Sequence, residues 1–261
     1  MSLQADTPFV LRSDAGGVTT LTLNRSERFN PLSEEMLAAL QTEFKAIATD
    51  ESVRVVVLAA AGKAFCAGHD LKQMQANSSE AYYKSLFQQC SKLMLAIQKL
   101  PQPVIARVHG LATAAGCQLV GMCDLAVACD NASFAVSGVN VGLFCSTPAV
   151  ALSRNVSRKQ AMEMLLTGEF IDARTAMQRG LINRVVSTEQ LDTCVAELAA
   201  SIVAKPAIAI SVGKQLFYKQ LEMGVEAAYQ LAGQTMACNM LDASAQEGVQ
   251  AFLAKRRPDW S

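Results

Sequence analysis

The chain has 261 residues, of which 51% are hydrophobic, so it can form one large domain or two small ones around a sizeable core. Its 23 basic residues balance its 23 acidic residues, which gives no electrostatic reason to expect nucleic acid or an anionic membrane as a partner. No uninterrupted apolar run approaches the roughly 18 residues of a membrane span. The first ten residues, MSLQADTPFV, lack the features of a secretory signal and the arginine-rich character of a transit peptide, so we expect a cytoplasmic protein.

The first half of the chain predicts alternating strands and helices. Residues 18–23 (VTTLTL) alternate and are β-branched, which favours a half-buried strand. Ser33 precedes apolar residues at helical spacing over 34–49 and is expected to cap that helix. Further strands are expected at 53–60, 104–108 and 125–129, with helices at 81–100 and 116–122. This alternation is typical of an α/β domain with parallel strands.

The second half of the chain predicts mostly helices. They are expected at residues 157–166, 172–180, 187–204, 208–223 and 224–256, with a brief strand at 182–186. No linker rich in Gly, Ser or Pro separates the two halves, and there is no internal repeat. We therefore expect an α/β core over residues 1–200, followed by a packed helical region over residues 201–261.

The cysteines predict buried thiols rather than a metal site. None of the eight forms a CxxC pair, and only two histidines are present to help them bind a metal. Most lie in apolar runs, as small core residues do in a reducing compartment. The eight are Cys66, Cys90, Cys117, Cys123, Cys129, Cys145, Cys194 and Cys238.

Two glycine-containing turns are the strongest candidates for a site. Residues 63–74 (KAFCAGHDLKQM) follow the strand 53–60, and residues 110–119 (GLATAAGCQL) follow the strand 104–108. In open α/β sheets ligands bind where strands end and helices begin, and free backbone N–H groups lie there. Each turn alone is also compatible with an ordinary strand-to-helix connection, but two facing turns could hold one carbonyl oxygen as an oxyanion hole. The absence of a GxGxxG loop disfavours a nucleotide-binding fold of the Rossmann type.

Three segments closely resemble the enoyl-CoA hydratase/isomerase (crotonase) family: AFCAGHDLKQM, PVIARVHGLATAAGCQLVGMCDLAVACDNASF and MEMLLTGEFIDARTAMQRGLINRVV. The resemblance extends from VTTLTLNRSERFNPLS to EGVQAFLAKRRPDW, and residues 138–148 (GVNVGLFCSTP) point to one subgroup of the family. It implies a ClpP-like spiral of ββα units with a C-terminal helical trimerisation region. It also implies an acyl-CoA ligand, with coenzyme A as part of the substrate and no metal or redox cofactor, and homotrimers or hexamers.

The resemblance also implies roles for particular residues. By motif position, the oxyanion donors would be the backbone N–H groups of His69 and Ala115. Alanine keeps the N–H of the glycine that many relatives have, provided that a positive φ is not needed there. The other implied substrate-contacting residues are Arg28 and Asn30 beside the pantetheine arm, Ala67, Gly68, Asp70, Leu71 and Lys72 in the first loop, Gly116 in the second turn, and Ser137, Gly138 and Cys145 near the acyl pocket. Lys255 and Arg256 either meet CoA phosphates or lie on a solvated helix.

Two positions depart from the family's hydratases. Hydratases have GCE where this chain has GCQ, so Gln118 stands in place of a carboxylate that acts on water. The second hydratase carboxylate lies in a pattern like FGQPEILLG, and here FAVSGVNVG puts Gly138 in its place. An amide can orient a water molecule but cannot ionise it, and glycine has no side chain. Because acid–base catalysis contributes about 10²- to 10⁴-fold, we expect hydration to be weak or lost.

Three hypotheses on function remain open. The first is an acyl-CoA enzyme that isomerises, decarboxylates or hydrolyses thioesters. The second is a non-catalytic acyl-CoA-binding protein, and the third is a hydratase with a substitute acid such as the His69 side chain. Asp124 and Asp70 are expected to be structural, Asp70 as a helix cap. Cys145, near Ser146 and Thr147 beside the acyl pocket, is expected to be a buried, inert thiol.

Overall fold

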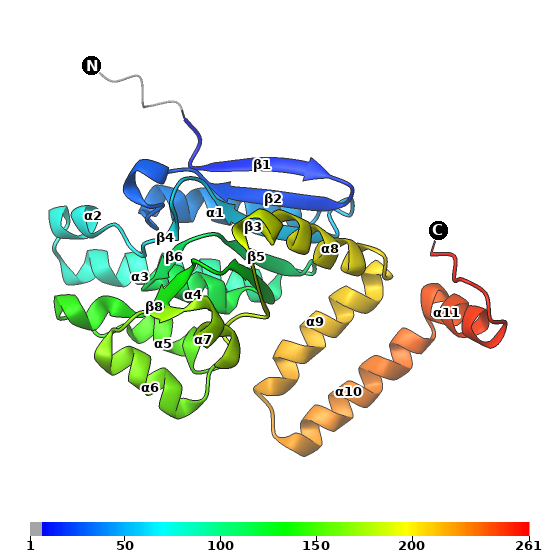
Figure 1. The fold of residues 1–261 in the computed structure, drawn as a ribbon. Coiled ribbons are helices and arrows are strands. Elements are labelled where there is room, and N and C mark those ends of the chain that lie inside the picture. Colours follow the sequence, from blue (N-terminus) through cyan, green and yellow to red (C-terminus); the bar gives the residue numbers. More distant parts are fainter. Residues whose placement is uncertain (1–6, 261) are drawn as a thin grey trace.

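The computed structural model describes residues 7–260, so the first six residues of the N-terminal segment lie outside the described residues (Figure 1). Its larger sheet has the strand order β1-β2-β3-β5-β7-β10. The hairpin β1–β2 is antiparallel, and every other neighbouring pair in this sheet is parallel. The strands are β1 (Val10–Ala15), β2 (Val18–Leu23), β3 (Val55–Ala60), β5 (Val104–Val108), β7 (Leu125–Cys129) and β10 (Arg184–Val186).

A second sheet of short strands is built by the same repeats. After β3, β5 and β7 the chain passes directly to a strand of the second sheet and then into helices, so three ββα turns wind into a spiral. The second sheet contains β4 (Ala64–Cys66), β6 (Leu111–Thr113), β8 (Ser133–Ala135) and β9 (Ile171–Asp172). This confirms the predicted α/β spiral of ββα units.

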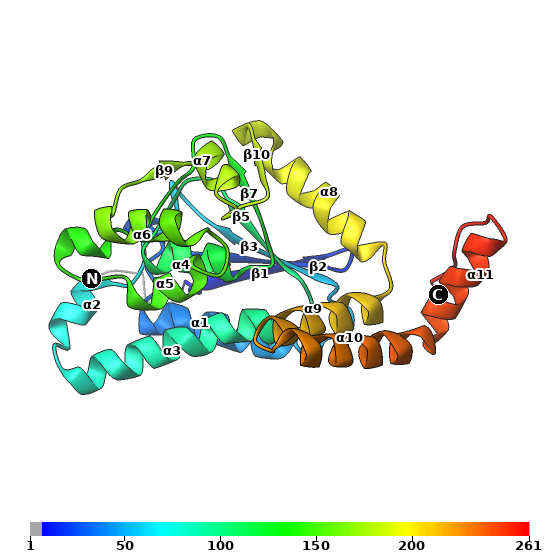
Figure 2. The same ribbon diagram turned by 90° about the horizontal axis from the view of Figure 1, so that it is seen from below.

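Helices cover both faces of the larger sheet. α1 and α3 pack against each other along one face, and α8 lies against the other (Figure 2). The Ser33 side chain accepts a hydrogen bond from the Met36 N–H at 3.3 Å, as expected of the α1 cap. The helices are α1 (Glu34–Ile47), α2 (Leu71–Ala76), α3 (Glu80–Lys99), α4 (Ala115–Met122), α5 (Ser146–Leu152), α6 (Arg158–Thr167), α7 (Ala173–Gln178), α8 (Leu191–Val203), α9 (Ala207–Leu221), α10 (Val225–Met240) and α11 (Ala243–Leu253).

The structure corrects several expected elements. The predicted helix over residues 224–256 is two helices, because Asp242 interrupts it and its carboxylate accepts the Ser244 N–H at 2.9 Å, capping α11. The strands of the second sheet have two or three residues each, too few to show a period of two. Six cysteines are buried as predicted, but Cys194 is half-buried and Cys238 is exposed.

A buried lysine attaches α9 to the core. The Lys214 ammonium donates to the carbonyls of Ile97 and Gln102 at 2.9 and 3.0 Å and to Asp124 Oδ2 at 2.6 Å. The Tyr218 hydroxyl donates to the other Asp124 oxygen at 2.8 Å. Asp124 is therefore engaged in structure, and α9 is held by the core.

The last two helices leave the core. In both views α10 and α11 extend away from the two sheets (Figures 1 and 2). Their surfaces carry strongly exposed apolar side chains, including Val225, Tyr229, Met236 and Phe252, each more than two-thirds exposed. The predicted division at residue 200 falls inside α8. Within residues 7–260 no single helix is long and apolar enough for a membrane span, and the segments 188–203 and 207–220 meet that criterion only as a pair bent by 102°.

Candidate functional site

The two predicted turns contact each other. A Cβ added to Gly68 would lie 2.9 Å from the Ala114 Cβ and 3.3 Å from the Ala115 nitrogen. Ala115 is the first residue of α4, so its N–H has no partner within the helix. Neither this N–H nor that of His69 has an acceptor among residues 7–260. The turns therefore bring two unused backbone donors into one region.

Gly116 allows this approach. A Cβ at this position would lie only 2.1 Å from the carbonyl oxygen of Cys66, the last residue of β4. Any side chain would therefore push the first turn of α4 away from the strand that leads to His69. Close contact between β4 and α4 explains why glycine is needed in the second turn.

Ala114 carries the backbone strain of the site. Its φ of 50° and ψ of −120° match the first central residue of a type II′ turn, a conformation dominated by glycine. The sequence analysis made the role of Ala115 depend on the absence of a positive φ there. Ala115 has no positive φ, and the positive φ of this turn is found at the preceding residue, Ala114. Such strain is common at functional sites, where surrounding contacts enforce it.

Replacing Ala114 by glycine is expected to stabilise the protein by about 1 kcal/mol. Relief of about 1–3 kcal/mol of strain outweighs the roughly 0.5–1 kcal/mol entropic cost of glycine. Urea unfolding at fixed protein concentration measures the change. The control is Ala112→Gly in the buried strand β6, where φ is not positive and the substitution only removes a methyl group. Equal destabilisation by both substitutions would contradict the assignment of strain to Ala114.

A cavity of about 210 Å³ opens beside these turns. Seven predicted site residues line it, together with Ser146 and Thr147: Ala67, His69, Leu71, Ala115, Ser137, Gly138 and Cys145. The remaining lining residues are not among the predicted site residues; they are Met74, Phe87, Ala114, Val141, Leu143, Phe144 and Pro148. Met74 follows Leu71 by three residues in α2, and this helical spacing was a usable signal.

The surroundings of the His69 imidazole favour its neutral form with the proton on Nδ1. Its Nδ1 lies 3.2 Å from the Leu32 carbonyl oxygen, which can only accept a hydrogen bond, so Nδ1 carries the proton. Burial lowers the pKa of His69. Nε2 is buried and has no partner among residues 7–260. The ring meets Phe87 edge-on, with centroids 5.5 Å apart.

The loop at Gly138 leaves no space for a side chain. A Cβ there would lie 2.4 Å from the Leu143 carbonyl oxygen and 2.8 Å from Cys145 Sγ. The Gly138 N–H donates to that sulfur at 3.2 Å, and burial raises the pKa of the Cys145 thiol. Cys145 is thus a buried neutral thiol, and the loop conformation itself excludes a carboxylate at position 138.

Gln118 does not form part of the cavity wall. Its side chain is on α4 and only 5% of the residue is exposed. Its backbone N–H donates to the Ala114 carbonyl at 3.1 Å, and its Oε1 is buried without a partner in residues 7–260. It is absent from the residues that line the 210 Å³ cavity.

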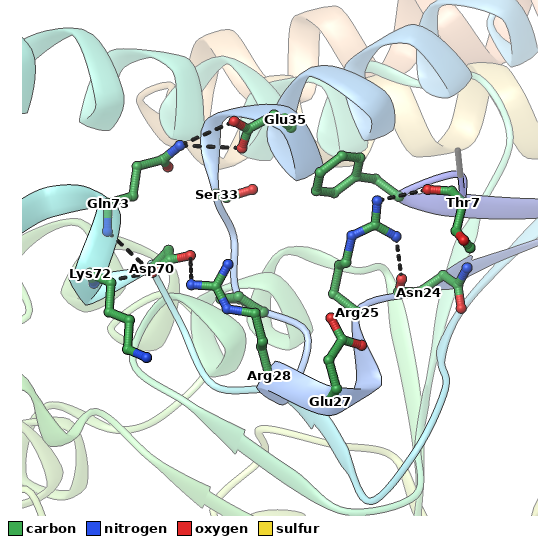
Figure 3. A pocket seen from close by; sticks show the side chains of 12 residues that line it. Thr7, Asn24, Arg25, Glu27, Arg28, Ser33, Glu35, Asp70, Lys72 and Gln73 are labelled. Atoms are coloured by element: carbon green, nitrogen blue, oxygen red, sulfur yellow. Dashed lines mark hydrogen bonds and ion pairs between the residues drawn. The ribbon is translucent and has the colours of Figure 1, made fainter. Parts of the chain in front are cut away.

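A second, polar cavity of about 610 Å³ lies on the other side of the first loop (Figure 3). Asp70 caps α2 as predicted, accepting the N–H groups of Lys72 and Gln73 at 3.1 and 3.3 Å. Its other oxygen pairs with Arg28 at 2.5 Å. The lining residues are Thr7, Phe9, Asn24, Arg25, Glu27, Arg28, Pro31, Ser33, Glu35, Asp70, Lys72 and Gln73. Because Asp70 follows His69 directly, one loop borders both cavities.

Asn30 does not fit its implied role. Its side chain is fully buried, and its Nδ2 donates to the carbonyls of Ala61 and Ala64 at 2.8 and 2.9 Å. Its Oδ1 accepts the Arg25 N–H at 2.8 Å. With donors and acceptor engaged by the backbone, the side chain has a structural role, which corrects the expectation of a ligand contact.

Lys255 and Arg256 follow α11, away from both cavities (Figure 2). The Arg256 guanidinium makes a bidentate pair with Glu247 at 2.6 and 2.7 Å. This pairing lowers the pKa of Glu247 to about 2. Within one chain these cations do not join the candidate site.

Comparison with known proteins gives consistent matches over nearly the whole chain. The sequence model of the enoyl-CoA hydratase/isomerase family matches residues 13–261. The mitochondrial enoyl-CoA hydratase domain-containing protein 3 of Rattus norvegicus is 47% identical over 94% of this chain and 82% of its own length. A crystal structure described as an enoyl-CoA hydratase of Mycobacterium smegmatis is 64% identical, with a TM-score of 0.96 over 97% of this chain and 99% of that one.

The subgroup expected from residues 138–148 is confirmed. The crystal structure of human enoyl-CoA hydratase domain-containing protein 3 is 44% identical, with a TM-score of 0.94 over 97% of this chain and all of that chain. Together with the rat relative, it indicates similarity to this subgroup along the whole fold.

The expectation of a cytoplasmic protein is wrong by the same comparison. The relatives from rat, mouse and human are named mitochondrial, and this finding contradicts the expectation. Receptors recognise a short targeting segment, and the composition of the first ten residues is a weak indicator of such a segment.

The family match and the shared fold together show that the chain belongs to the enoyl-CoA hydratase/isomerase family, whose members bind CoA thioesters and are typically oligomeric.

Proposed function

We propose that this protein binds an acyl-CoA thioester and polarises its carbonyl between the backbone N–H groups of His69 and Ala115. The observation that carries the proposal is the contact between the two turns, which leaves both donors without a protein acceptor in residues 7–260. Donors fixed in place before the ligand arrives stabilise an oxyanion at little reorganisation cost.

The two cavities suit the two ends of such a ligand. The wall of the polar cavity has three cations, Arg25, Arg28 and Lys72, and three acids, Glu27, Glu35 and Asp70. Arg25 is held by backbone carbonyls and Arg28 by Asp70, so Lys72 is the cation that suits the phosphate groups of CoA. The other cavity is mainly apolar and takes the acyl group. The first loop borders both cavities at consecutive residues, so the thioester lies beside His69.

Efficient hydration is not part of the proposal. No Asp or Glu lines the 210 Å³ cavity, Gln118 is not part of its wall, and the loop at Gly138 leaves no space for a carboxylate. The protein keeps the polarising groups and lacks both acids. The exposed apolar surfaces of α10 and α11 support a homotrimer or a hexamer built from trimers.

Loss of enoyl absorbance from crotonyl-CoA tests this proposal. We expect binding by calorimetry and no turnover at hydratase-like rates, either for the unsubstituted protein or for Gln118→Glu, because residue 118 does not line the acyl cavity. Adding Gly138→Glu is expected to bring no gain either, because its side chain would collide with the Leu143 carbonyl. Rapid hydration by the unsubstituted protein would contradict the proposal and direct attention to the unpartnered Nε2 of His69.

A further inference from the structure

We infer that the 210 Å³ cavity selects uncharged, apolar acyl groups of about six to eight carbons and rejects acyl groups that end in a carboxylate. This inference rests on the proposed function, since it concerns the acyl end of the same ligand. It names the substrate class that the cavity admits.

The charge of the wall is the first argument. None of the residues that line this cavity is Asp, Glu, Lys or Arg. The imidazole of His69 donates from Nδ1 to the Leu32 carbonyl, and burial lowers the pKa of the ring, which favours the neutral form with a lone pair on Nε2. A carboxylate placed here would meet no cation, and burying an unpaired charge is strongly unfavourable.

The polar groups of the wall are mostly engaged with the protein. The hydroxyls of Ser137 and Thr113 lie 2.7 Å apart, within hydrogen-bond distance. The Ser146 hydroxyl donates to the Phe144 carbonyl at 3.3 Å, and Cys145 Sγ accepts the Gly138 N–H. Few donors therefore remain to solvate an anionic acyl end.

Apolar side chains around the opening are the second argument. Leu71 is 57% exposed and Val141 is 67% exposed, and they lie on two different segments of the cavity wall. Leu143 and Phe144 are also nearly half exposed. An apolar chain that lies between α2 and the 141–144 loop would cover these side chains, and burial of such surface favours binding.

The volume sets the length of the chain. A cavity of about 150 Å³ accommodates benzene, which has six carbons. The 210 Å³ cavity therefore accommodates a slightly larger group, of about six to eight carbons. The additional carbons of longer acyl chains would extend into solvent and add little to the binding affinity.

Calorimetric titration of the full-length protein with CoA, hexanoyl-CoA, adipoyl-CoA and dodecanoyl-CoA tests the inference. Hexanoyl and adipoyl groups have the same number of carbons and differ in the terminal carboxylate. We expect hexanoyl-CoA to bind at least roughly 100-fold more tightly than adipoyl-CoA, because the carboxylate is unpaired in the cavity. Dodecanoyl-CoA should bind about as tightly as hexanoyl-CoA.

A substitution that introduces a positive charge sharpens the test. Leu71→Lys puts an ammonium at the opening, and position 71 is exposed, so the substitution should not disturb folding. It should strengthen the binding of adipoyl-CoA by about tenfold and weaken the binding of hexanoyl-CoA. The matched control is Leu166→Lys on α6, which is 59% exposed and does not line the cavity, and which should change neither affinity.

Three contrary results bear on different parts of the inference. Equal affinities for hexanoyl-CoA and adipoyl-CoA would overturn the selectivity while leaving the proposed function in place. If affinity rose severalfold for each methylene group beyond eight carbons, the length limit would be overturned and the proposed function would again stay in place. Absence of binding by CoA and by every thioester would overturn the proposed function itself.

Discussion

Gly116→Ala is expected to destabilise the protein by about 3 kcal/mol and to weaken acyl-CoA binding at least roughly tenfold. The added methyl group would lie 2.1 Å from the Cys66 carbonyl oxygen, a backbone atom that cannot move aside without moving β4. Relief of this collision displaces the first turn of α4 and therefore the Ala115 N–H. Urea unfolding and calorimetric titration with hexanoyl-CoA measure the two effects.

The same helix provides the control. Gly121 also lies in α4, but a Cβ there would make only ordinary contacts, the nearest at 3.5 Å from the Ala151 Cβ. Gly121→Ala should leave binding unchanged and alter stability by no more than about 1 kcal/mol, in the stabilising direction expected for alanine inside a helix. Similar losses from both substitutions would show that the contact at Gly116 has no special role.

Lys214→Met is expected to destabilise the protein by about 3–5 kcal/mol. The substitution leaves the Asp124 carboxylate without its cation, and the Ile97 and Gln102 carbonyls lose their donor. Burial lowers the pKa of Lys214, and the Asp124 carboxylate offsets part of this desolvation cost. Denaturant unfolding at one fixed protein concentration measures the loss, since oligomers gain stability with concentration.

Two further variants isolate this network. Lys219→Met changes an exposed lysine of the same helix and should shift stability by less than about 0.5 kcal/mol. Combining Lys214→Met with Asp124→Asn removes the unpaired charge and should recover part of the loss. If Lys214→Met costs no more than Lys219→Met, the network does not hold α9 to the core.

The features that the sequence predicts well are those with long periodic patterns or specific motifs. The strand at 18–23 and the cap at Ser33 are local signals, and the structure confirms both. The three-residue strands of the second sheet escape prediction because they pair only through the tertiary winding of the chain. Asp242 also carried a usable signal, since a capping aspartate inside a long helical pattern marks the start of a new helix.

The site was predicted at the level of segments rather than side chains. Motif position cannot show that the Asn30 side chain is engaged by backbone groups, because the two carbonyls that accept its Nδ2 hydrogens belong to residues more than thirty positions away. Likewise, the collision at Gly138 depends on the fold of the 143–145 loop. The sequence indicates that a carboxylate is missing there, and the structure adds that none can be accommodated.

The carbonyl stretching frequency of bound hexanoyl-CoA, labelled with ¹³C at the thioester carbon, tests the central claim most directly. Two hydrogen bonds from the His69 and Ala115 N–H groups should shift this infrared band to lower frequency than in the free ligand, and Gly116→Ala should remove most of the shift. A bound thioester whose carbonyl band stays at the frequency of the free ligand would contradict the oxyanion hole.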